Sequence, residues 1–252
     1  MNGRQQQIKK MLDTAGEVHL QELRKVFTDM SEMTLRRDLS FLENEGYAIR
    51  TYGGAVSTNK VDLLDGQENE YSKRAKEGTM AKTAIAAKAV RFIEKGRSIY
   101  LDAGSTVMGL ANLIEGDGCT FVTSAVNTAL KLSSTAHSVM QLGGAVNKNT
   151  LSCSGPDALL MMDDFNIDVA IMSASGFSLD RGFTISNRYE CLLKQKVLSK
   201  AKKVVMLMDC SKIDKDLTFT FASLEDIDYW VCDKEPDSVI INKCKEFEVE
   251  LI

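Results

Sequence analysis

The residues of this chain best suited to chemistry are two adjacent arginines inside a short amphipathic segment. The segment runs from Ser31 to Leu39 and reads Ser-Glu-Met-Thr-Leu-Arg-Arg-Asp-Leu. Leu35, Leu39 and Leu42 recur at i, i+4 and i+7, which places them on one face of a helix. A helix buried along that face presents polar and cationic groups to the outside, which suits insertion into a DNA major groove. The side chains of this helix that we expect at the DNA are Thr34, Arg36 and Arg37.

The flanking sequence favours a groove-reading helix over a merely solvated amphipathic one. Apolar spacing predicts helices over Arg4–Leu12 and Leu20–Phe27, and a three-residue turn separates the second from Ser31. Two short helices joined by a tight turn form the helix-turn-helix arrangement. Ser31 is the predicted N-cap of the second, cation-bearing helix of that motif, and the free amides at its start favour a nearby phosphate.

A glycine pair follows this motif within a strand-like stretch. After Gly46 the chain reads Tyr-Ala-Ile-Arg-Thr-Tyr-Gly-Gly-Ala-Val. This pattern predicts a two-stranded wing that turns at Gly53 and Gly54. Arg50 on the wing is then expected to reach a phosphate or a minor groove, so Arg50, Gly53 and Gly54 join the predicted DNA-binding residues.

A second group of polar residues follows an apolar run at Asp102-Ala103-Gly104-Ser105-Thr106, directly before a predicted helix. Gly104 allows the backbone to approach a ligand closely. Ser105, Thr106 and the amides at the helix start are suited to hold a phosphate. The alternative is an ordinary capped helix start.

Further polar residues stand where other predicted strands end. Ligands of parallel sheets bind outside the carboxyl ends of the strands, so these positions are candidates for the same site. They are Thr123-Ser124, Gly143-Gly144, the run Gly182-Phe183-Thr184 with Asn187 and Glu190, and Asp209-Cys210-Ser211-Lys212, whose lysine is suited to neutralise phosphate charge.

The elements that must position these residues alternate along the chain. Predicted strands are Ser98–Asp102, Thr120–Thr123, Val139–Leu142, Val169–Met172, Val204–Met208 and Tyr229–Cys232. Predicted helices are 79–94, Val107–Ile114, Val126–Leu132, Ala158–Phe165, Tyr189–Lys200 and Ser238–Phe247. Apolar strands separated by helices predict an α/β domain with a mostly parallel sheet covered on both faces. We therefore divide the chain into a DNA-binding domain over 1–57, a linker over 58–72 and a sensing domain over 73–252.

Composition constrains the class of protein. The 252 residues carry a net charge of −4, and residues 1–57 hold eight cations and eight acids, so the DNA-binding part must concentrate its cations locally. No apolar run reaches membrane-spanning length, and the N-terminus has no signal-peptide pattern. The six cysteines form no Cys-x-x-Cys pair, so we expect reduced thiols, no metal site and a cytoplasmic protein.

These motifs together resemble the DeoR-type bacterial regulators. The resemblance rests on Thr34–Leu39, Leu42-Glu43, Gly46, Arg50 and Gly53-Gly54-Ala55, and further along on Asp102–Thr106, Leu142–Gly144, Gly182–Thr184 with Glu190, and Asp209–Lys212. It implies a winged helix-turn-helix joined to a Rossmann-like sugar-phosphate-sensing domain similar to ribose-5-phosphate isomerase.

The resemblance also implies roles for individual residues. Gly104, Ser105 and Thr106 hold the phosphate with help from Lys212. Asp102 and Glu190 contact hydroxyls or the loop, and Lys82 matches a recurrent lysine of the family. For Asp102, Glu190 and Lys82 a purely structural role, as a helix cap or in a salt bridge, stays open. The effector-binding residues implied in this way are Lys82, Asp102, Gly104, Ser105, Thr106, Thr123, Gly143, Gly144, Glu190 and Lys212.

The similarity to an isomerase raises the question of catalysis. Moving a proton between sugar carbons needs a positioned carboxylate base. The isomerases supply it in an Asp-Gly-Ala-Asp-Glu run at a strand end, whereas here Met172 is followed by Ser-Ala-Ser-Gly-Phe and no acid occurs until Asp180. His19 and His137 have no evident nucleophile partner. We therefore expect a binding domain without catalytic residues and without a cofactor.

The sequence thus predicts a cytoplasmic DNA-binding transcriptional regulator, a repressor of a sugar-metabolism operon that responds to a phosphorylated sugar. Its predicted partners are double-stranded operator DNA and the sugar phosphate, and it is expected to form a homodimer or homotetramer without membrane association. The alternatives are a sugar-phosphate isomerase-like enzyme fused to a DNA-binding domain, and a regulator that senses a partner protein.

Overall fold

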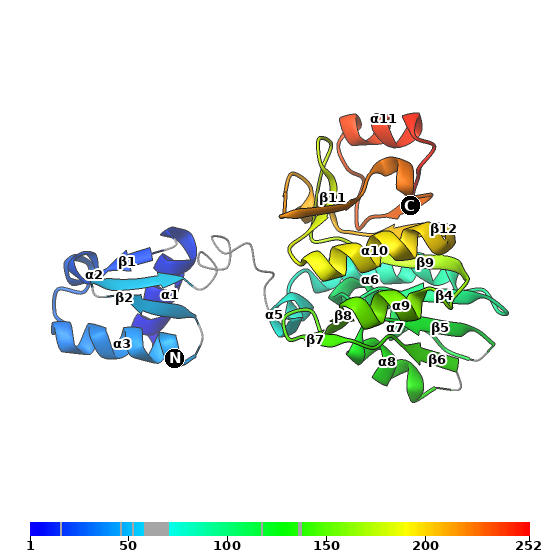
Figure 1. The fold of residues 1–252 in the computed structure, drawn as a ribbon. Coiled ribbons are helices and arrows are strands. Elements are labelled where there is room, and N and C mark those ends of the chain that lie inside the picture. The colour runs from blue at the N-terminus through cyan, green and yellow to red at the C-terminus, as the bar shows by residue number, and fades with distance from the viewer. Residues whose placement is uncertain (16, 46, 52, 58–70, 117, 136–137) are drawn as a thin grey trace. The chain divides into compact units, whose positions relative to one another are not determined.

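The chain folds into two compact units, residues 1–67 and 68–252. The computed structural model describes residues 1–252 except 16, 46, 52, 58–70, 117 and 136–137 (Figure 1). Most of the predicted linker, 58–72, therefore lies outside the described residues, and its last two residues, Tyr71 and Ser72, belong to a helix. We describe each unit by itself.

The first unit combines three helices with a small antiparallel sheet. Its sheet has the strand order β1-β3-β2. Its elements are α1 (Gly3–Ala15), β1 (Glu17–His19), α2 (Leu20–Val26), α3 (Glu32–Asn44), β2 (Ala48–Thr51) and β3 (Gly54–Ser57). The predicted helix-turn-helix and wing are both present. Strand β1 was not predicted, because three residues are too few to show a period.

The leucine seam of α3 is confirmed. Leu35, Leu39 and Leu42 are at most 1% exposed and pack with Ile8 and other apolar residues of the unit. Burying this seam fixes the rotation of α3 about its own axis. The opposite side of the helix is therefore the side left to solvent.

The second unit is built on a seven-stranded sheet in which every pair of neighbours is parallel. Its order is β15-β14-β12-β9-β4-β5-β6. The strands are β4 (Ser98–Leu101), β5 (Thr120–Thr123), β6 (Ser138–Gln141), β9 (Ile167–Ser173), β12 (Ala201–Leu207), β14 (Tyr229–Val231) and β15 (Glu250–Leu251). The predicted α/β class with a parallel sheet is confirmed.

Helices cover both faces of this sheet (Figure 1). They are α5 (Tyr71–Lys76), α6 (Thr79–Ala89), α7 (Ser105–Ala111), α8 (Val126–Ser133), α9 (Pro156–Met162), α10 (Arg188–Lys200) and α11 (Ser238–Glu246). Short 3-10 turns add η1 (Val90–Phe92), η2 (Cys210–Lys212) and η3 (Leu224–Asp226). The helix predicted over 79–94 therefore ends earlier, at Ala89, and continues as η1.

Two cores form because successive strand residues point to opposite faces. Ile99 and Phe121 pack with α6 and α7, while Tyr100 and Val122 pack with α9, α10 and α11. All four are fully buried. This two-sided burial explains why the strands read as continuous apolar runs rather than as alternating ones.

Two smaller sheets were not predicted. One pairs β7 (Ala145–Asn147) with β8 (Ser152–Ser154), and the other has the order β10-β11-β13 over Gly176–Ser178, Gly182–Ile185 and Phe219–Ala222. The predicted polar run at Gly182 is therefore strand β11. Among the described helices, none is both long enough and apolar enough to cross a membrane.

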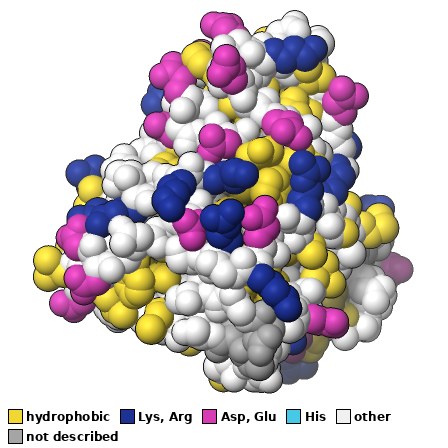
Figure 2. All heavy atoms as spheres, turned by 90° about the vertical axis from the view of Figure 1, so that its right-hand side faces the viewer, with side chains coloured by type: hydrophobic (Ala, Val, Ile, Leu, Met, Phe, Trp, Pro, Cys, Tyr) yellow, Lys and Arg dark blue, Asp and Glu magenta, His cyan; other side chains and the backbone are white. Residues whose placement is uncertain are grey.

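The amino ends of the sheet strands carry paired charges. Lys202 donates to Asp168 at 2.8 Å, and Lys196 lies 2.5 Å from Asp163. Figure 2 shows Lys and Arg side chains gathered across the middle of the face it presents, with Asp and Glu among them. Lys202 and Lys196 are therefore already paired with carboxylates.

Candidate functional site

The solvent side of α3 carries the predicted recognition residues. Ser31 caps the helix, and its Oγ accepts a hydrogen bond from the Thr34 amide at 3.2 Å, as predicted. The Thr34 hydroxyl lies 2.9 Å from the same Oγ. The side chains of Arg36 and Arg37 are exposed beyond this cap. The first two turns of α3 therefore present the polar surface that a major groove requires.

The two arginines of α3 differ in their partners. Arg36 lies 2.8 Å from Glu32, one turn earlier, and Glu32 lies 3.7 Å from Arg24 of α2. Within the described part of the chain, Arg37 has no ion-pair partner. Arg37 is therefore available to a phosphate or a base edge at once, while Arg36 must first leave Glu32.

The wing arginine is held against α3. Arg50 donates from Nε to Glu43 at 2.8 Å, and its amide donates to the same carboxylate at 3.1 Å. These bonds lower the pKa of the Glu43 carboxyl, with the backbone bond as the largest cause. Since about half of the Arg50 side chain is exposed, the pair is suited to exchange its carboxylate for a phosphate.

The two wing glycines serve packing in this structure. A Cβ on Gly54 would lie 2.0 Å from the Val18 carbonyl oxygen, because β1 and β3 approach closely there. The Gly53 carbonyl accepts from the Leu20 amide at 2.8 Å. The first contact joins the wing to β1 and the second joins it to the start of α2, so contact of these glycines with DNA stays a prediction.

The second site lies where the strand order of the large sheet reverses. Strands β5 and β6 extend from β4 in one direction, while β12, β14 and β15 extend beyond β9 in the other. Ligands of such sheets bind in the crevice at this switch point, outside the carboxyl ends. A cavity of about 20 Å³ opens there. Its lining residues are Arg74, Ala103, Gly104, Thr106, Thr150, Ser173, Ala174, Ser175, Ile185, Glu190, Lys194 and Lys212.

A buried ion pair braces the floor of this cavity. The Lys194 ammonium of α10 donates to the Asp102 carboxylate, and also to the Ser173 carbonyl at 2.9 Å. The side chains of both charged residues are at most 7% exposed. Asp102 also accepts from the Ser173 amide at 2.9 Å and from its hydroxyl at 3.0 Å. Asp102 thus ties β4 to β9 and α10, the structural role that the sequence left open.

Gly104 follows Asp102 in a conformation that excludes other residues. Its φ is 150°, and a Cβ there would lie 2.7 Å from the Ser173 hydroxyl. Both the backbone angle and the lack of space therefore require glycine. Thr106 lines the cavity beside it, whereas Ser105, the first residue of α7, is not among the lining residues. Two of the three residues of the predicted phosphate loop, Gly104 and Thr106, therefore line the cavity.

Glu190 stands on the opposite wall within a polar network. Its Oε1 accepts from Thr150 and Ser152 at 2.5 Å each and from Asn147 at 3.0 Å. Asn187 caps α10 and holds the Glu190 amide at 3.1 Å. Three donors on one oxygen fix the carboxylate at the cavity edge.

Two further cations line the cavity. Lys212, predicted from the sequence, donates to the Ala174 carbonyl at 3.1 Å. Arg74 comes from α5 and donates to the Asn149 carbonyl at 3.1 Å. Arg74 and Lys212 are thus the two cations of the lining that lie outside the buried Lys194–Asp102 pair.

Lys82 lies behind the lining and holds α5. Its ammonium donates to the carbonyls of Arg74 and Glu77, the latter at 2.6 Å. Burial lowers the pKa of the Lys82 ammonium, although the charge of Asp209 opposes this shift. Lys82 thus contacts the backbone of a lining residue instead of the cavity itself, which is the structural role left open for it.

The remaining predicted residues also lie outside the lining. Thr123 is buried, donates to the Leu101 carbonyl at 2.6 Å and accepts from the Ala125 amide at 3.0 Å. Gly144 has a φ of 112°, and a Cβ there would lie 2.5 Å from the Ser154 carbonyl oxygen. Gly143 precedes it after β6. Direct contact of these residues with an effector stays a prediction.

Sequence reasoning missed most of the lining residues, and three of them bear charge or hold the ion pair below the cavity. Arg74, Ser173 and Lys194 reach the cavity from segments that lie far apart in the chain. For Lys194 a signal existed, because Glu190 and Lys194 lie four residues apart on one helix face, at the same end of the sheet. For Arg74 the only indication was a cation shortly after the linker.

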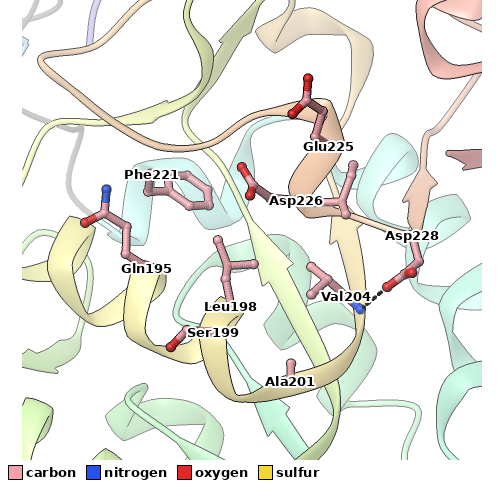
Figure 3. Close-up of a pocket in the computed structure, with 10 residues that line it drawn as sticks. Gln195, Leu198, Ser199, Ala201, Val204, Phe221, Glu225, Asp226 and Asp228 are labelled. Atoms are coloured by element: carbon pink, nitrogen blue, oxygen red, sulfur yellow. Dashed lines mark hydrogen bonds between the residues drawn. The ribbon is translucent and has the colours of Figure 1, made fainter. Parts of the chain in front are cut away.

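A larger groove of about 420 Å³ does not suit an anion. Figure 3 shows it between the end of α10, the start of β12 and η3. Three carboxylates, Glu225, Asp226 and Asp228, line it, and none of its described lining residues is Lys or Arg. Asp228 is already occupied by the Val204 amide at 2.7 Å. The smaller, cation-bearing cavity is therefore the candidate effector site.

Two known protein-family domains match this chain, one in each unit. Residues 4–61 match the DeoR-like helix-turn-helix domain, and residues 77–234 match the DeoR C terminal sensor domain. The chain belongs to the DeoR family. It is therefore a DNA-binding transcriptional regulator with an N-terminal helix-turn-helix and a C-terminal sensor, as the sequence motifs predicted.

Individual DeoR-family relatives are similar over most of their length. The HTH-type transcriptional regulator GlpR of Haloferax volcanii is 33% identical over 82% of this chain and 80% of its own. GolR of Listeria innocua is 31% identical over 96% and 94%. Among solved structures, ribose 5-phosphate isomerase A of Methanocaldococcus jannaschii covers 52% of this chain and 53% of its own at 14% identity. The TM-score of that comparison is 0.37.

Proposed function

We propose that this DeoR-family regulator is a repressor of a sugar-metabolism operon and that its sensor binds a phosphorylated sugar in the Arg74–Lys212 cavity. The single observation that carries the proposal is the convergence of these two cations with Gly104 and Thr106 at the switch point of the sheet. Two cations and close backbone approach suit a dianionic phosphate. The sugar hydroxyls then have Glu190 and Thr150 as polar partners.

Named relatives support the repressor role. GlcR of Bacillus subtilis, called a transcriptional repressor, is 30% identical over 88% of this chain and 85% of its own. A putative aga operon transcriptional repressor of Escherichia coli O157:H7 is 25% identical over 99% and 92%. By analogy, the regulator acts at operator DNA as a homodimer or homotetramer in the cytoplasm.

The isomerase alternative has less support. Among the described lining residues, Glu190 is the only carboxylate, and three donors already fix its Oε1. A base that abstracts a proton from a sugar carbon must keep an oxygen aimed at that carbon. The residues after β9 at this edge, Ser173, Ala174 and Ser175, supply no second acid. A binding role therefore fits this wall better than proton transfer.

The cavity must widen to take its ligand. Its volume of about 20 Å³ suits roughly one water molecule. A sugar phosphate is many times larger, so lining residues must move apart on binding. Arg74 lies on the six-residue helix α5, whereas Gly104 and Ser173 are fixed by the sheet and by Asp102. Movement on the Arg74 side therefore disturbs the fewest buried contacts.

The test is a thermal-shift screen of the full chain with ribose-5-phosphate, other hexose and pentose phosphates and the unphosphorylated sugars. A ligand that binds only the folded state raises the melting temperature. We expect at least one phosphorylated sugar to do so and its unphosphorylated form to have no effect. The best ligand should also weaken binding of the chain to its operator.

Two variants locate the site within that screen. Arg74→Gln removes a charge-assisted contact and should lower affinity for the active sugar phosphate by about tenfold or more. Lys76→Gln, an exposed cation on the same helix, is the matched control and should bind as the unmodified chain does. Absence of any phosphosugar effect, or normal binding by Arg74→Gln, would overturn the proposal.

A further inference from the structure

The two edges of the seven-stranded sheet differ in protection. Edge strand β15 has only two residues, and its Glu250 carboxylate lies 3.4 Å from Arg91. The other edge strand, β6, has four residues and no charged side chain. Among the described strands, none pairs with the outer side of β6. Natural sheets guard such edges with charges, prolines or very short strands, and β6 has none of these protections.

The sequence around β6 is nearly free of charge. Residues 118–147 contain a single Lys, Arg, Asp or Glu, which is Lys131, although 26% of the whole chain is charged. Large apolar side chains of this segment are nevertheless exposed. They are Val126 at 40%, Leu130 at 74%, Met140 at 44% and Val146 at 58%. A surface of this composition costs free energy when it faces water.

The exposed apolar groups flank the edge on both faces of the sheet. Helix α8 packs through Leu132 into the core that also holds Val139 of β6, and Leu130 of the same helix is left exposed. Met140 pairs with Val122, which belongs to the core on the opposite face. Figure 1 shows α8 and β6 together at one border of this unit. Leu130 and Met140 therefore leave apolar surface uncovered on either side of the strand.

We infer that the edge formed by β6 and α8 is the surface through which a second copy of this chain docks. A second copy suits this edge because the edge carries almost no charge. With one cation in thirty residues, the edge offers no charge pattern that would select a partner of opposite charge, and two copies meet there with little like-charge repulsion. An apolar, nearly uncharged surface is complementary to itself.

Symmetry is compatible with this docking. A two-fold axis normal to the sheet pairs an edge strand antiparallel with its own copy. Side chains directly opposite one another then lie on the same face, so Val139 meets Val139 or Met140 meets Met140 of the second copy. Ser138 lies opposite Met140 in the first register and Val139 lies opposite Gln141 in the second, so each register places an apolar pair on the axis and no charge beside it. The result is a continuous sheet that runs through both sensor units.

The inference rests on the proposed function only in that a repressor of two-fold operators needs paired copies. Its test therefore uses the full chain without DNA or effector. Sedimentation equilibrium should show a dimer or a higher even multiple. Leu130→Glu and Met140→Glu each place a charge in the contact and should weaken association by at least about tenfold. Leu160→Glu, on α9 at 69% exposure and outside this edge, is the matched control and should associate normally.

Because the substituted residues are exposed, we expect the variants to fold. Circular dichroism and the melting temperature test this. If either variant melts early, Ser138→Lys supplies the same test, because it adds a cation to the exposed edge strand. A monomeric unmodified chain, or variants that associate as tightly as it does, would overturn the inference. Loss of the phosphosugar effect in an intact dimer would instead count against the proposed function alone.

Discussion

The two units hold the ion pairs beside their candidate sites in opposite ways. In the DNA-binding unit, Arg36 and Arg50 are about half exposed, and their carboxylate partners lie four and seven residues away in the chain. In the sensor unit, Lys194 is buried with Asp102, 92 residues away. An exposed pair gains little free energy and is easily exchanged for a phosphate. A buried pair cannot lose one partner without leaving the other charge unpaired. The pairs at the DNA-binding surface are thus suited to exchange ionic partners, and the pair below the cavity is suited to keep its own.

The largest effect that tests this comparison is expected from Lys194→Met. The variant leaves the Asp102 carboxylate buried without its cation, which costs about 3–5 kcal/mol of unfolding free energy. The loss should appear in the sensor unit and be measured by urea unfolding of the full chain, followed through Trp230, the single tryptophan, which is buried in that unit.

The matched control lies two residues further along α10. Lys196 pairs with Asp163 at the surface, with 31% and 51% of the two side chains exposed. Lys196→Met should cost at most about 1 kcal/mol. Adding Asp102→Asn to Lys194→Met should recover part of the lost stability. Equal effects of the two lysine substitutions would remove the distinction between buried and exposed ion pairs.

The next effect concerns exchange of partners at α3. Arg37→Ala should reduce operator affinity by about 1–3 kcal/mol if the arginine contacts a base. Arg36→Ala should cost less, because this arginine gives up Glu32 when it binds DNA. Fluorescence anisotropy with operator DNA measures both, and Arg91→Ala, an exposed arginine of the sensor unit, should leave affinity unchanged. Unchanged affinity in both α3 variants would contradict the assignment of this helix.

A smaller effect is expected at the wing. If Arg50 exchanges Glu43 for a phosphate, Arg50→Ala should lower the magnitude of the salt slope of operator binding by about 0.9. Affinity should fall to a similar degree for specific and nonspecific DNA, because a phosphate contact carries no sequence information. A loss confined to the operator would show that Arg50 reads bases instead.

The smallest effect is a pH dependence at the amino end of the sheet. Hydrogen bonds from Lys202 and the Ser98 amide lower the pKa of Asp168 to about 2, below the unfolded value of about 3.9. The ionised carboxylate therefore stabilises the fold above about pH 4, and this contribution is lost as the pH falls toward 2. Because Lys202 is 76% exposed, Asp168→Asn should cost no more than about 1 kcal/mol near pH 6. Urea unfolding at pH 6 and pH 3 should show the variant's deficit shrinking at the lower pH.

The fold could be predicted from the sequence wherever a helix or strand was long enough to show a regular spacing of apolar residues. The leucine seam of α3 and the six apolar strands of the large sheet showed clear patterns, and each is present. Strands β1 and β15 have three and two residues, too few for a period to show. The β10-β11-β13 sheet was missed because its strands have only three or four residues each, and because β13 pairs with β11 from a distant part of the sequence.

The two candidate sites also differ in how far the sequence alone could predict them. The recognition surface is one contiguous helix, so its cap, seam and cations could be read together. The effector cavity draws Arg74, Ser173 and Lys194 from separate segments, and only tertiary structure brings them to Gly104. Sequence reasoning therefore found the loop and Lys212. It missed the ion pair that positions the loop, because the partner of Asp102 is 92 residues away.

Helix α5 shows how one hydrogen-bonding side chain can set local stability. It has six residues and no buried one, and a helix of this length does not persist alone in water. Contact with α7 and the bonds from Lys82 to the carbonyls of Arg74 and of Glu77, the residue that follows the helix, hold it in place. Its free energy of local opening should therefore lie well below that of the whole sensor, and its amide hydrogens should exchange before those of β4. The wall that carries Arg74 is thus the part of the cavity that thermal fluctuation opens first.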